Sequence, residues 1–301
     1  MTTEGLTKNK AVVWLIVLVV FVLLMALASF LTSGDKIQGV APIGVTAIGL
    51  IIVFVIYFVT AQSDAWVVGT RQVVYMAIGA ALYGVFNYIF NTIPMPSVSQ
   101  VALRPSVCIP IFFGYAFGPV VGFFTGAVGN ILGDFITGWG VYPAWDIANG
   151  LMGMVPGLVM LFADKKRSLN FLTGLVAVLI IIVAALVFVN PQVPGPWTGE
   201  IEDFSFWAWA FIIGGVVVVV GRFVLERFSV DLAAINLWGT LGIIVGIGFA
   251  AISDIWINGY SFATAIIGEF APAAGPNILN AMILAPILLA AYQAVQSRTG
   301  R

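Results

Sequence analysis

The sequence predicts an all-α polytopic membrane protein with about ten transmembrane helices. Hydrophobic residues make up 61% of the chain and charged residues only 8%, whereas soluble domains carry about 25% charged residues. Apolar runs such as residues 11–31 are unbroken, and about 20 apolar residues in a helix cross about 30 Å of hydrocarbon. Strands of a transmembrane barrel would alternate apolar and polar residues instead. The spanning elements are therefore expected to be helices.

The spans are assigned to apolar runs of about 20 residues that end at polar residues or at Pro and Gly. They cover approximately residues 11–33, 40–61, 71–92, 101–117, 119–138, 144–163, 169–190, 206–226, 232–252 and 276–296. Gly118-Pro119 alone separates the fourth span from the fifth, which predicts a tight helical hairpin or, alternatively, one kinked helix. The first run exceeds the roughly 7 to 15 apolar residues of a signal peptide, so we expect it to be a retained span.

Basic residues predict the orientation of the spans, because cytoplasmic loops hold an excess of Lys and Arg. With the N-terminus in the cytoplasm, most of the basic residues fall on the cytoplasmic side: Lys8, Lys10, Arg71, Lys165, Lys166, Arg167, Arg222, Arg227, Arg298 and Arg301. Lys36 and Arg104 fall outside. Both termini are therefore expected in the cytoplasm.

Composition excludes several classes of function. The chain has no histidine, which disfavours imidazole metal sites and acid–base catalysis by histidine. Cys108 is the single cysteine, so no disulfide forms within the chain. A net charge of -1, with basic residues scattered at helix ends, gives no sign of nucleic-acid binding. No Gly-x-x-x-x-Gly-Lys-Ser/Thr loop is present, so an ATP site of that kind is absent.

Aromatic and acidic residues gather at the expected outer ends of the spans. The aromatic residues are Trp139, Tyr142, Trp145, Trp197, Trp256 and Tyr260, and the acidic residues are Asp134, Asp146, Glu200, Glu202, Asp203, Asp254 and Glu269. An interfacial aromatic belt is the alternative explanation for any one of these rings. Carboxylates beside rings at span ends also form pockets with a polar rim and stacking walls.

A stripe of glycines leads to two polar residues on one helix face. Gly118, Gly122 and Gly126 are four residues apart, a spacing that lets a neighbouring helix approach closely. Continuing the stripe by fours gives Asn130 and Asp134. An ionisable residue inside a membrane is a candidate for function, although Asp134 near the interface is also consistent with simple solvation.

The next span opens with a second polar group. Asp146 and Asn149 are three residues apart, so they share a helix face, and Trp145 flanks that face. A carboxylate in the first turn of a helix is also stabilised by the helix dipole, which is the competing explanation for Asp146.

These motifs, taken in order, resemble the substrate-binding S component of energy-coupling factor (ECF) type vitamin transporters. The resemblance rests on an ordered set of motifs: Arg104-Pro105, Gly118-Pro119 leading to Gly133-Asp134, Asn149 to Gly153 with Pro156-Gly157, Ala77 and Ala81 within residues 76–83, and residues 276–280 with Pro286. It covers a little over half of the chain. Each motif alone is weak, because Gly-x-x-x-Gly occurs in many helix bundles.

The resemblance implies a domain organisation and a set of partners. Residues 71–301 would form an S-component-like membrane domain with a two-helix insertion at about 166–230, and residues 1–70 a two-helix extension. The energy would come from two ATPase subunits and a transmembrane coupling subunit in a bacterial or archaeal cell membrane, and this chain itself would not be an enzyme. Ala77 and Ala81 would dock on the coupling subunit, with Ala80 and Gly84 adding small residues. Packing within the bundle is the alternative role for these residues.

The resemblance also implies an outward-facing pocket built from the first outer loop and later core helices. Candidate binding residues are Asn130, Asp134, Trp139, Trp145, Asp146, Asn149, Trp256, Tyr260, Glu269, Asn277 and Asn280. Rings and amides suit a flat heteroaromatic vitamin such as riboflavin or thiamine, and the surplus of acids favours a cationic or neutral solute. Arg104 either pairs with one of the carboxylates or meets an anionic group of the ligand. No bound cofactor is expected.

Two other functions remain open. A self-sufficient, ion-coupled secondary transporter would show internal repeats with interrupted helices, and residues 71–163 show no convincing repeat in residues 169–296. A membrane enzyme acting on lipid or isoprenoid substrates would show a concentrated set of acids or metal ligands, whereas the charged residues here are dispersed.

Overall fold

The computed structural model describes residues 10–32, 39–195 and 199–299 of the chain. Lys8, Lys36, Trp197 and Arg301, which entered the predictions of orientation and of the outer side, lie outside this part. The expectations for these four residues therefore stay predictions.

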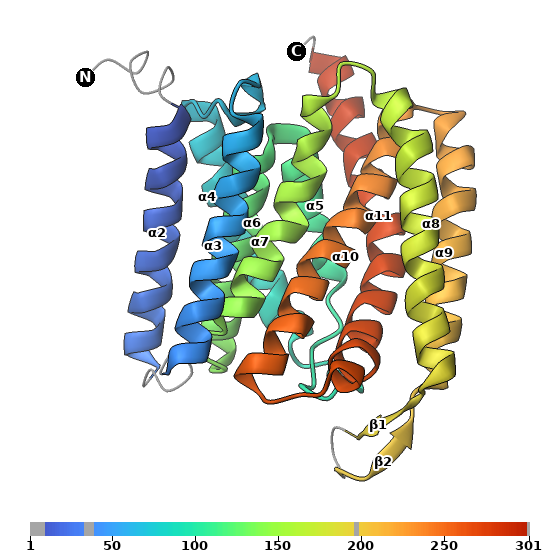
Figure 1. Ribbon diagram of the computed structural model, residues 1–301. Coiled ribbons are helices and arrows are strands. Elements are labelled where there is room, and N and C mark those ends of the chain that lie inside the picture. The colour runs from blue at the N-terminus through green and yellow to red at the C-terminus, as the bar shows by residue number, and fades with distance from the viewer. Residues whose placement is uncertain (1–9, 33–38, 196–198, 300–301) are drawn as a thin grey trace.

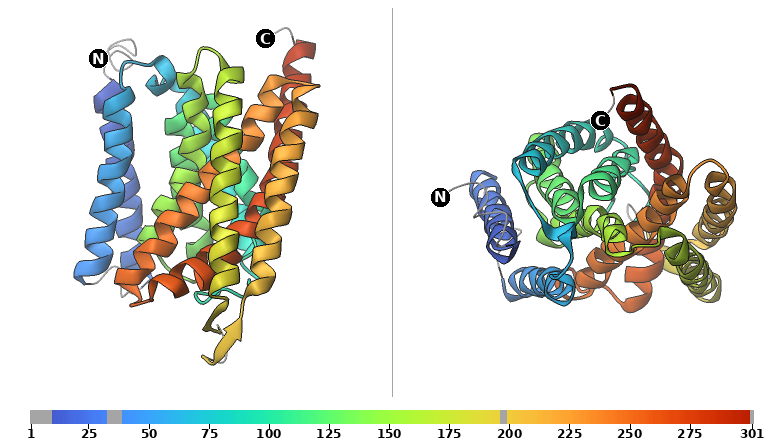
Figure 2. Two further views of the ribbon diagram at one scale, coloured as in Figure 1. Left: turned by 45° about the vertical axis from the view of Figure 1, so that its right-hand side comes forward. Right: turned by 90° about the horizontal axis from the view of Figure 1, so that it is seen from above.

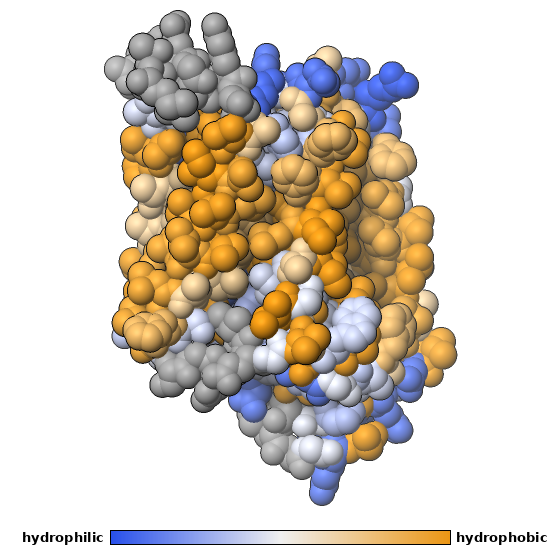
Figure 3. Space-filling model, turned by 60° about the vertical axis from the view of Figure 1, so that its left-hand side comes forward, coloured by the Kyte–Doolittle hydropathy of each residue, from blue (hydrophilic) through white to orange (hydrophobic). Residues whose placement is uncertain are grey.

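The described residues form a helical bundle, which confirms the all-α polytopic class (Figure 1). Ten α-helices are present in this part of the chain: α2 (Lys10–Leu31), α3 (Val40–Thr60), α4 (Thr70–Phe90), α5 (Cys108–Phe117), α6 (Pro119–Thr137), α7 (Pro143–Gly157), α8 (Lys165–Val189), α9 (Ser205–Glu226), α10 (Val230–Ile257) and α11 (Ala271–Thr299). Nine helical segments of this part are long and apolar enough to cross a membrane. A broad apolar belt covers the flank of the molecule, with polar residues gathered toward its two ends (Figure 3).

The predicted fourth span, residues 101–117, is wrong in its first part. The chain is extended up to Arg104, and the helical segment runs only over Pro105–Phe117. At 1.5 Å per residue this segment is about 20 Å long, too short to cross the hydrocarbon alone. Proline favours the first position of a helix, and the residue before it is pushed toward extended geometry. The Arg104-Pro105 pair therefore marks the helix start.

The glycine between α5 and α6 makes the predicted tight hairpin. Gly118 has φ +108°, a conformation that side chains disfavour, and Pro119 begins α6 at once. A Cβ on Gly114 of α5 would lie 3.3 Å from the Cα of Gly122 on α6, so the two helices fold back on each other. The kinked-helix alternative is therefore excluded.

The last helix begins earlier than predicted. A π-helical segment, η5 (Thr264–Phe270), runs directly into α11, so Pro276 lies inside the helix rather than at its start. Proline is tolerated inside membrane helices because local backbone adjustments and neighbouring groups satisfy the freed carbonyl. The sequence pattern also missed a short antiparallel hairpin, β1 (Gln192–Pro194) with β2 (Ile201–Asp203), which projects beyond the helix ends (Figure 1).

Helix α6 is held at close range between α4 and α7. A Cβ on Gly126 would overlap the backbone of Asn149 on α7, and Gly122 and Gly153 face each other in the same way. On the other side of α6, a Cβ on Gly129 would lie 2.8 Å from the Cβ of Tyr83 on α4. The predicted glycine seam is therefore a real helix contact, and it extends to both neighbours of α6.

The additional helices flank this core on two sides (Figure 2). Helix α2 packs on α6, and α3 packs on α7 and α10. Helices α8 and α9 pack on each other and on α10, and α9 also contacts α11. Neither the α2–α3 pair nor the α8–α9 pair covers the outer side of α4. Ala77 and Ala81 are therefore exposed there, whereas Ala80 and Gly84 are buried against α6. The internal-packing explanation therefore holds for Ala80 and Gly84 only.

The start of the first described helix and the end of the last lie on one side of the bundle. Helix α2 begins and α11 ends at the same side (Figure 1). Lys10 contacts Asp64 at 3.0 Å, and Lys165 contacts Asp231 at 2.6 Å, at the helix ends of that side. The only described basic residue toward the opposite side is Arg104, and it is buried. The side with Lys10 and Lys165 is the terminal side, and the opposite side is the far side.

Candidate functional site

The candidate site begins with the extended segment between α4 and α5, residues 91–104. It folds back on itself through an antiparallel bridge between Pro94 and Ala102, and the backbone N–H of Met95 donates to the carbonyl of Val101 at 2.7 Å. The turn holds Gln100 at φ +52°, the one described non-glycine residue with a positive φ. This segment, which we call the far-side loop, carries Arg104 at its end into the core.

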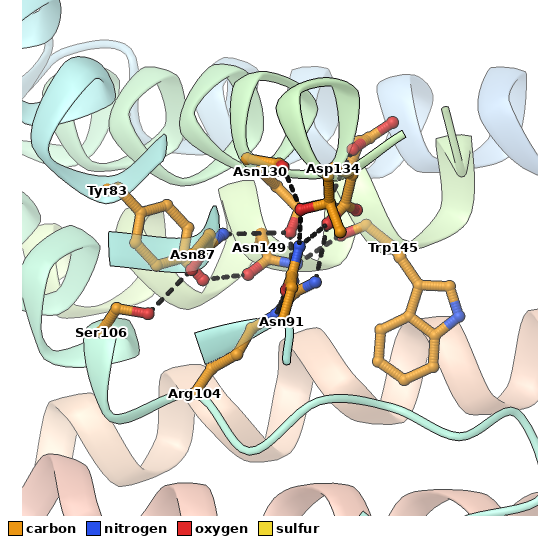
Figure 4. A network of polar contacts seen from close by, with 12 residues as sticks. Tyr83, Asn87, Asn91, Arg104, Ser106, Asn130, Asp134, Trp145 and Asn149 are labelled. Atoms are coloured by element: carbon orange, nitrogen blue, oxygen red, sulfur yellow. Dashed lines mark hydrogen bonds and ion pairs between the residues drawn. The ribbon is translucent and has the colours of Figure 1, made fainter. Parts of the chain in front are cut away.

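Arg104 is the centre of a buried polar network. Its side chain points from the far-side loop toward α6 (Figure 4). Nη2 contacts Oδ1 of Asp134 at 2.8 Å, Nη1 donates to Oδ1 of Asn130, and Nε donates to Oδ1 of Asn91 at 3.1 Å. Its backbone N–H donates to Oδ1 of Asn277 on α11 at 3.3 Å. One residue thus joins α4, α6 and α11, and of the two roles left open for Arg104 the structure assigns pairing with a carboxylate.

Asn130 connects the two buried carboxylates of α6 and α7. Its Nδ2 donates to Oδ2 of Asp134 at 3.0 Å and to Oδ1 of Asp146 at 2.8 Å. Asp146 is fully buried, and its Oδ2 has no hydrogen-bond partner among the described residues. The helix dipole alone does not account for Asp146, because its Oδ1 also accepts a hydrogen bond from Asn130 on the neighbouring helix α6.

A second layer of the network lies toward the middle of the bundle. The hydroxyl of Tyr83 donates to Oδ1 of Asn149, whose Nδ2 donates to the carbonyl of Trp145 at 2.8 Å. The hydroxyl of Ser106 donates to Oδ1 of Asn87 at 2.7 Å. These side chains come from α4, α7 and the start of the α5 segment, so they tie the three helices together beneath Arg104 (Figure 4).

A cavity of about 650 Å³ opens above this network. Its lining residues are Pro42, Val98, Ser99, Gln100, Val101, Ala102, Arg104, Asp134, Trp139, Tyr142, Pro143, Ala144, Trp145, Asp254, Ile257 and Asn258. Arg104 and Asp134 form its polar floor, the far-side loop forms one wall, and rings from the α6–α7 connection form another. A cavity of this size, with few polar groups and several rings, suits a small organic solute.

The tip of the far-side loop is fastened to η5. The backbone N–H of Ser99 donates to Oε2 of Glu269 at 2.8 Å, and that of Val98 donates to the carbonyl of Gly268 at 2.9 Å. The hydroxyls of Ser99 and Tyr260 lie 3.3 Å apart. Burial raises the pKa of the Tyr260 phenol, and the nearby carboxylates of Glu269 and Asp254 also raise it, so this phenol stays protonated as a donor at neutral pH.

Asp254 brings a further carboxylate to the cavity wall near the end of α10. Its Oδ1 accepts a hydrogen bond from Nδ2 of Asn258 at 2.9 Å. Its Oδ2 is buried and has no hydrogen-bond partner among the described residues, although the Trp145 side chain lies beside it. Asp254 is 2% exposed.

The predicted binding residues fall into four groups. Asp134, Trp139 and Trp145 line the cavity, and Asn130, Asp146, Asn149 and Asn277 lie in the network beneath it. Glu269 and Tyr260 hold the loop tip. Trp256 is 64% exposed, and Asn280 is half-buried on α11; neither belongs to the cavity wall. The structure therefore brings nine of the eleven residues to the site and leaves out these two.

Sequence reasoning missed several residues of the site. Asp254 and Tyr142 were noted at the outer side but not selected, although an acid at the end of an apolar span is the signal that selected Asp134. Asn87 and Asn91 carry the same signal, since amides inside an apolar span rarely lack a partner. Ser99 gave no signal, because its partner Glu269 lies 170 residues away in the sequence.

Part of this chain is similar in sequence to known proteins. Residues 67–193 match the family model described as ECF-type riboflavin transporter, S component. A UPF0397 protein of Vibrio atlanticus is 36% identical over 99 residues, which are 32% of this chain and 52% of that protein. UPF0397 proteins of Aliivibrio salmonicida and Aliivibrio fischeri are each 34% identical over 96 residues, which are 32% of this chain and 51% of theirs. The chain thus spans about half the length of the curated relatives it matches, and no solved structure matches it.

The matched segment contains most of the site. It begins just before α4, where the S-component-like domain was predicted to start, and includes the far-side loop, Arg104, Asn130, Asp134 and Asp146. It also includes α8, which the sequence analysis assigned to an insertion. Residues 67–193 of this chain are therefore similar to the S component of ECF-type transporters.

Proposed function

We propose that this chain is the substrate-binding membrane subunit of an ATP-driven ECF-type importer. It captures a vitamin or related small heterocyclic solute at the far side, which the positive-inside rule makes the outside of the cell. Separate ATPase subunits and a transmembrane coupling subunit supply the energy. Both chain ends then lie in the cytoplasm of a bacterial or archaeal cell.

The observation that carries this proposal is the far-side cavity inside the segment that matches the S-component model. Its volume of about 650 Å³ suits one small molecule, and three aromatic side chains line it. The family model is named for riboflavin, which is likewise a flat ring system. The polar floor is braced by the buried network, so the site is preorganised rather than assembled by the ligand.

Mass spectrometry of the purified protein tests the proposal directly. We expect a small heterocycle to co-purify with the chain at close to one molecule per protein. We also expect no concentrative uptake when the chain is reconstituted alone, because the energy is proposed to come from the separate ATPase subunits. Uptake driven by an ion gradient in that preparation would contradict the proposal and favour a secondary transporter.

Two tryptophans provide a matched test of the cavity. Trp145 lines the cavity, whereas Trp256 is exposed outside it. Trp145→Ala is expected to weaken binding of the co-purifying solute about tenfold or more, because a stacking wall is lost. Trp256→Ala is expected to leave the Kd unchanged. Isothermal titration calorimetry measures the Kd of both variants. Equal changes in Kd for the two substitutions would show that the cavity is not the binding site.

The coupling subunit is proposed to dock on the exposed face of α4 around Ala77 and Ala81. Both residues are exposed, and four residues of spacing place them on the same helix stripe. Small side chains let a partner helix approach closely, so van der Waals contact drives association in lipid. The added helix pairs pack elsewhere, on α6, α7, α10 and α11, and leave this face open.

Bulky substitutions on α4 test this docking face. Ala77→Trp combined with Ala81→Trp is expected to abolish uptake in cells that supply the partner subunits, while ligand binding by the purified chain is retained. The control is Val178→Trp combined with Ile182→Trp, an exposed pair with the same spacing on α8, which is expected to keep uptake. Retained uptake in the α4 variant would exclude this surface, and loss of ligand binding in it would mean misfolding.

A further inference from the structure

We infer that the solute carries a positive charge and that the Asp254 carboxylate is its anchor. This inference rests on the proposed function and names the class of solute that the cavity takes. It follows from three features of the cavity wall: the balance of charge, an unpartnered carboxylate oxygen, and the rings around it.

Acidic residues outnumber basic ones in the described cavity wall. Arg104 is its one basic residue, and Asp134 and Asp254 are its two acidic residues. The Arg104 guanidinium contacts Asp134 at 2.8 Å and also donates to Asn130 and Asn91. Its charge is therefore committed to the Asp134 pair beneath the cavity, and Asp254 has no cationic partner among the described residues.

The acidic groups around Asp254 supply no counter-charge to it. Glu269 on η5 has a buried Oε1 without a hydrogen-bond partner among the described residues. Beneath the floor, Oδ2 of Asp146 is likewise buried and unpartnered in this part of the chain. Burying an ionised carboxylate without a counter-charge is costly, so a cation in the cavity would stabilise the ionised form of Asp254.

Asp254 is the one of these carboxylates that is placed to meet a solute in the cavity. Its Oδ1 is occupied by Asn258 at 2.9 Å, whereas Oδ2 has no hydrogen-bond partner among the described residues. Trp145 lies beside this carboxylate, and the side chain of Trp145 points away from the buried network (Figure 4). A nitrogen cation at this place would gain a charge-assisted contact with Oδ2.

The rings of the cavity support the same class of solute. Trp139, Tyr142 and Trp145 line the wall, and faces of Trp and Tyr attract cations most strongly where water is excluded. A positive charge delocalised over a heteroaromatic ring would use both features at once, since it stacks on a ring and pairs with a carboxylate. A carboxylate-bearing or phosphate-bearing solute would be repelled by Asp254.

Matched probes that differ in charge test this inference on the full-length chain in lipid nanodiscs. One series is 1-methylnicotinamide, nicotinamide and nicotinate, which are a cation, a neutral molecule and an anion on one ring. The second is thiamine with its neutral isostere 3-deazathiamine, and riboflavin is added as a neutral flavin. We expect at least one cation to bind about tenfold or more tightly than its neutral counterpart, and nicotinate not to bind.

Asp254→Asn keeps the shape of the side chain and removes its charge. We expect this variant to lose about tenfold or more in affinity for the preferred cation while its affinity for the neutral counterpart changes less than about twofold. The matched control is Asp203→Asn, which removes an exposed carboxylate on β2 and is expected to change neither. Thermal melting monitors folding, and the cation is expected to raise the Tm of the unsubstituted chain more than that of Asp254→Asn.

The outcomes separate the inference from the proposed function. Tight binding of riboflavin or of the anion in preference to both cations would overturn the cation inference and leave the importer proposal standing. Equal loss of affinity for a cation and its neutral counterpart in Asp254→Asn would also overturn it. Failure of every probe to bind, with no solute co-purifying, would contradict both.

Discussion

Gly126→Ala is expected to destabilise the protein by about 3 kcal/mol or more and to abolish solute binding. A Cβ at this position would overlap the backbone carbonyl of Asn149 on α7. Backbone atoms cannot rotate away as a side chain can, so α6 and α7 must separate. Their separation would also pull Asn130 away from Asp146, which it contacts at 2.8 Å, and would open the floor of the cavity.

Gly174→Ala on α8 is the control for this prediction. No atom lies within 4 Å of a Cβ built on Gly174, and alanine favours a helix over glycine by about 0.5–1 kcal/mol. This variant is therefore expected to be as stable as the original chain or slightly more so. The thermal stability of both variants is measured as their Tm in detergent. Equal Tm values for Gly126→Ala and Gly174→Ala would refute the close contact of α6 and α7.

Arg104→Leu is expected to cost about 3–5 kcal/mol, because it leaves Asp134 buried without a counter-charge. Arg104 is 7% exposed and its partner Asp134 is 3% exposed. The substitution also removes the donors to Asn91 and Asn130. Arg104→Lys keeps the charge, but a lysine cannot reach three acceptors in one plane. An intermediate loss of unfolding free energy is therefore expected for this variant.

A double substitution distinguishes the lost charge balance from lost packing. Arg104→Leu combined with Asp134→Leu removes both buried charges and is expected to recover much of the stability, although it should not restore solute binding. The control is Lys165→Ala, which breaks a half-exposed ion pair with Asp231 and is expected to cost less than about 1 kcal/mol. Equal unfolding free energies for Arg104→Leu and Lys165→Ala would show that the network does not hold the core.

The helices and the glycine seam were predictable because local spacing encodes them. A repeat of four residues fixes one face of a helix whatever surrounds it, so Gly122, Gly126, Asn130 and Asp134 were expected on a single stripe. The structure has Gly126 against α7 and Asp134 against Arg104. Amides and carboxylates in apolar spans need partners, which is why these residues belong to the buried network.

The shape of the site could not be predicted, because contacts between distant segments determine it. The loop tip at Ser99 meets Glu269 across 170 positions, and no spacing rule encodes that pairing. The rotation of α10 about its axis also determines which of its residues face the cavity. Asp254 and Ile257 line the cavity, whereas Trp256 faces outward. A helix that is apolar nearly all round leaves its rotation undetermined by sequence.

The first residues of α3 complete the wall of the cavity. Pro42 lines it, although it belongs to a helix pair outside the segment that matches the S-component model. Helix α3 packs on α7 and α10. A chain shortened to begin at α4 would therefore have a gap in the cavity wall that lipid acyl chains could enter. Helix α3 thus separates this part of the cavity from the lipid.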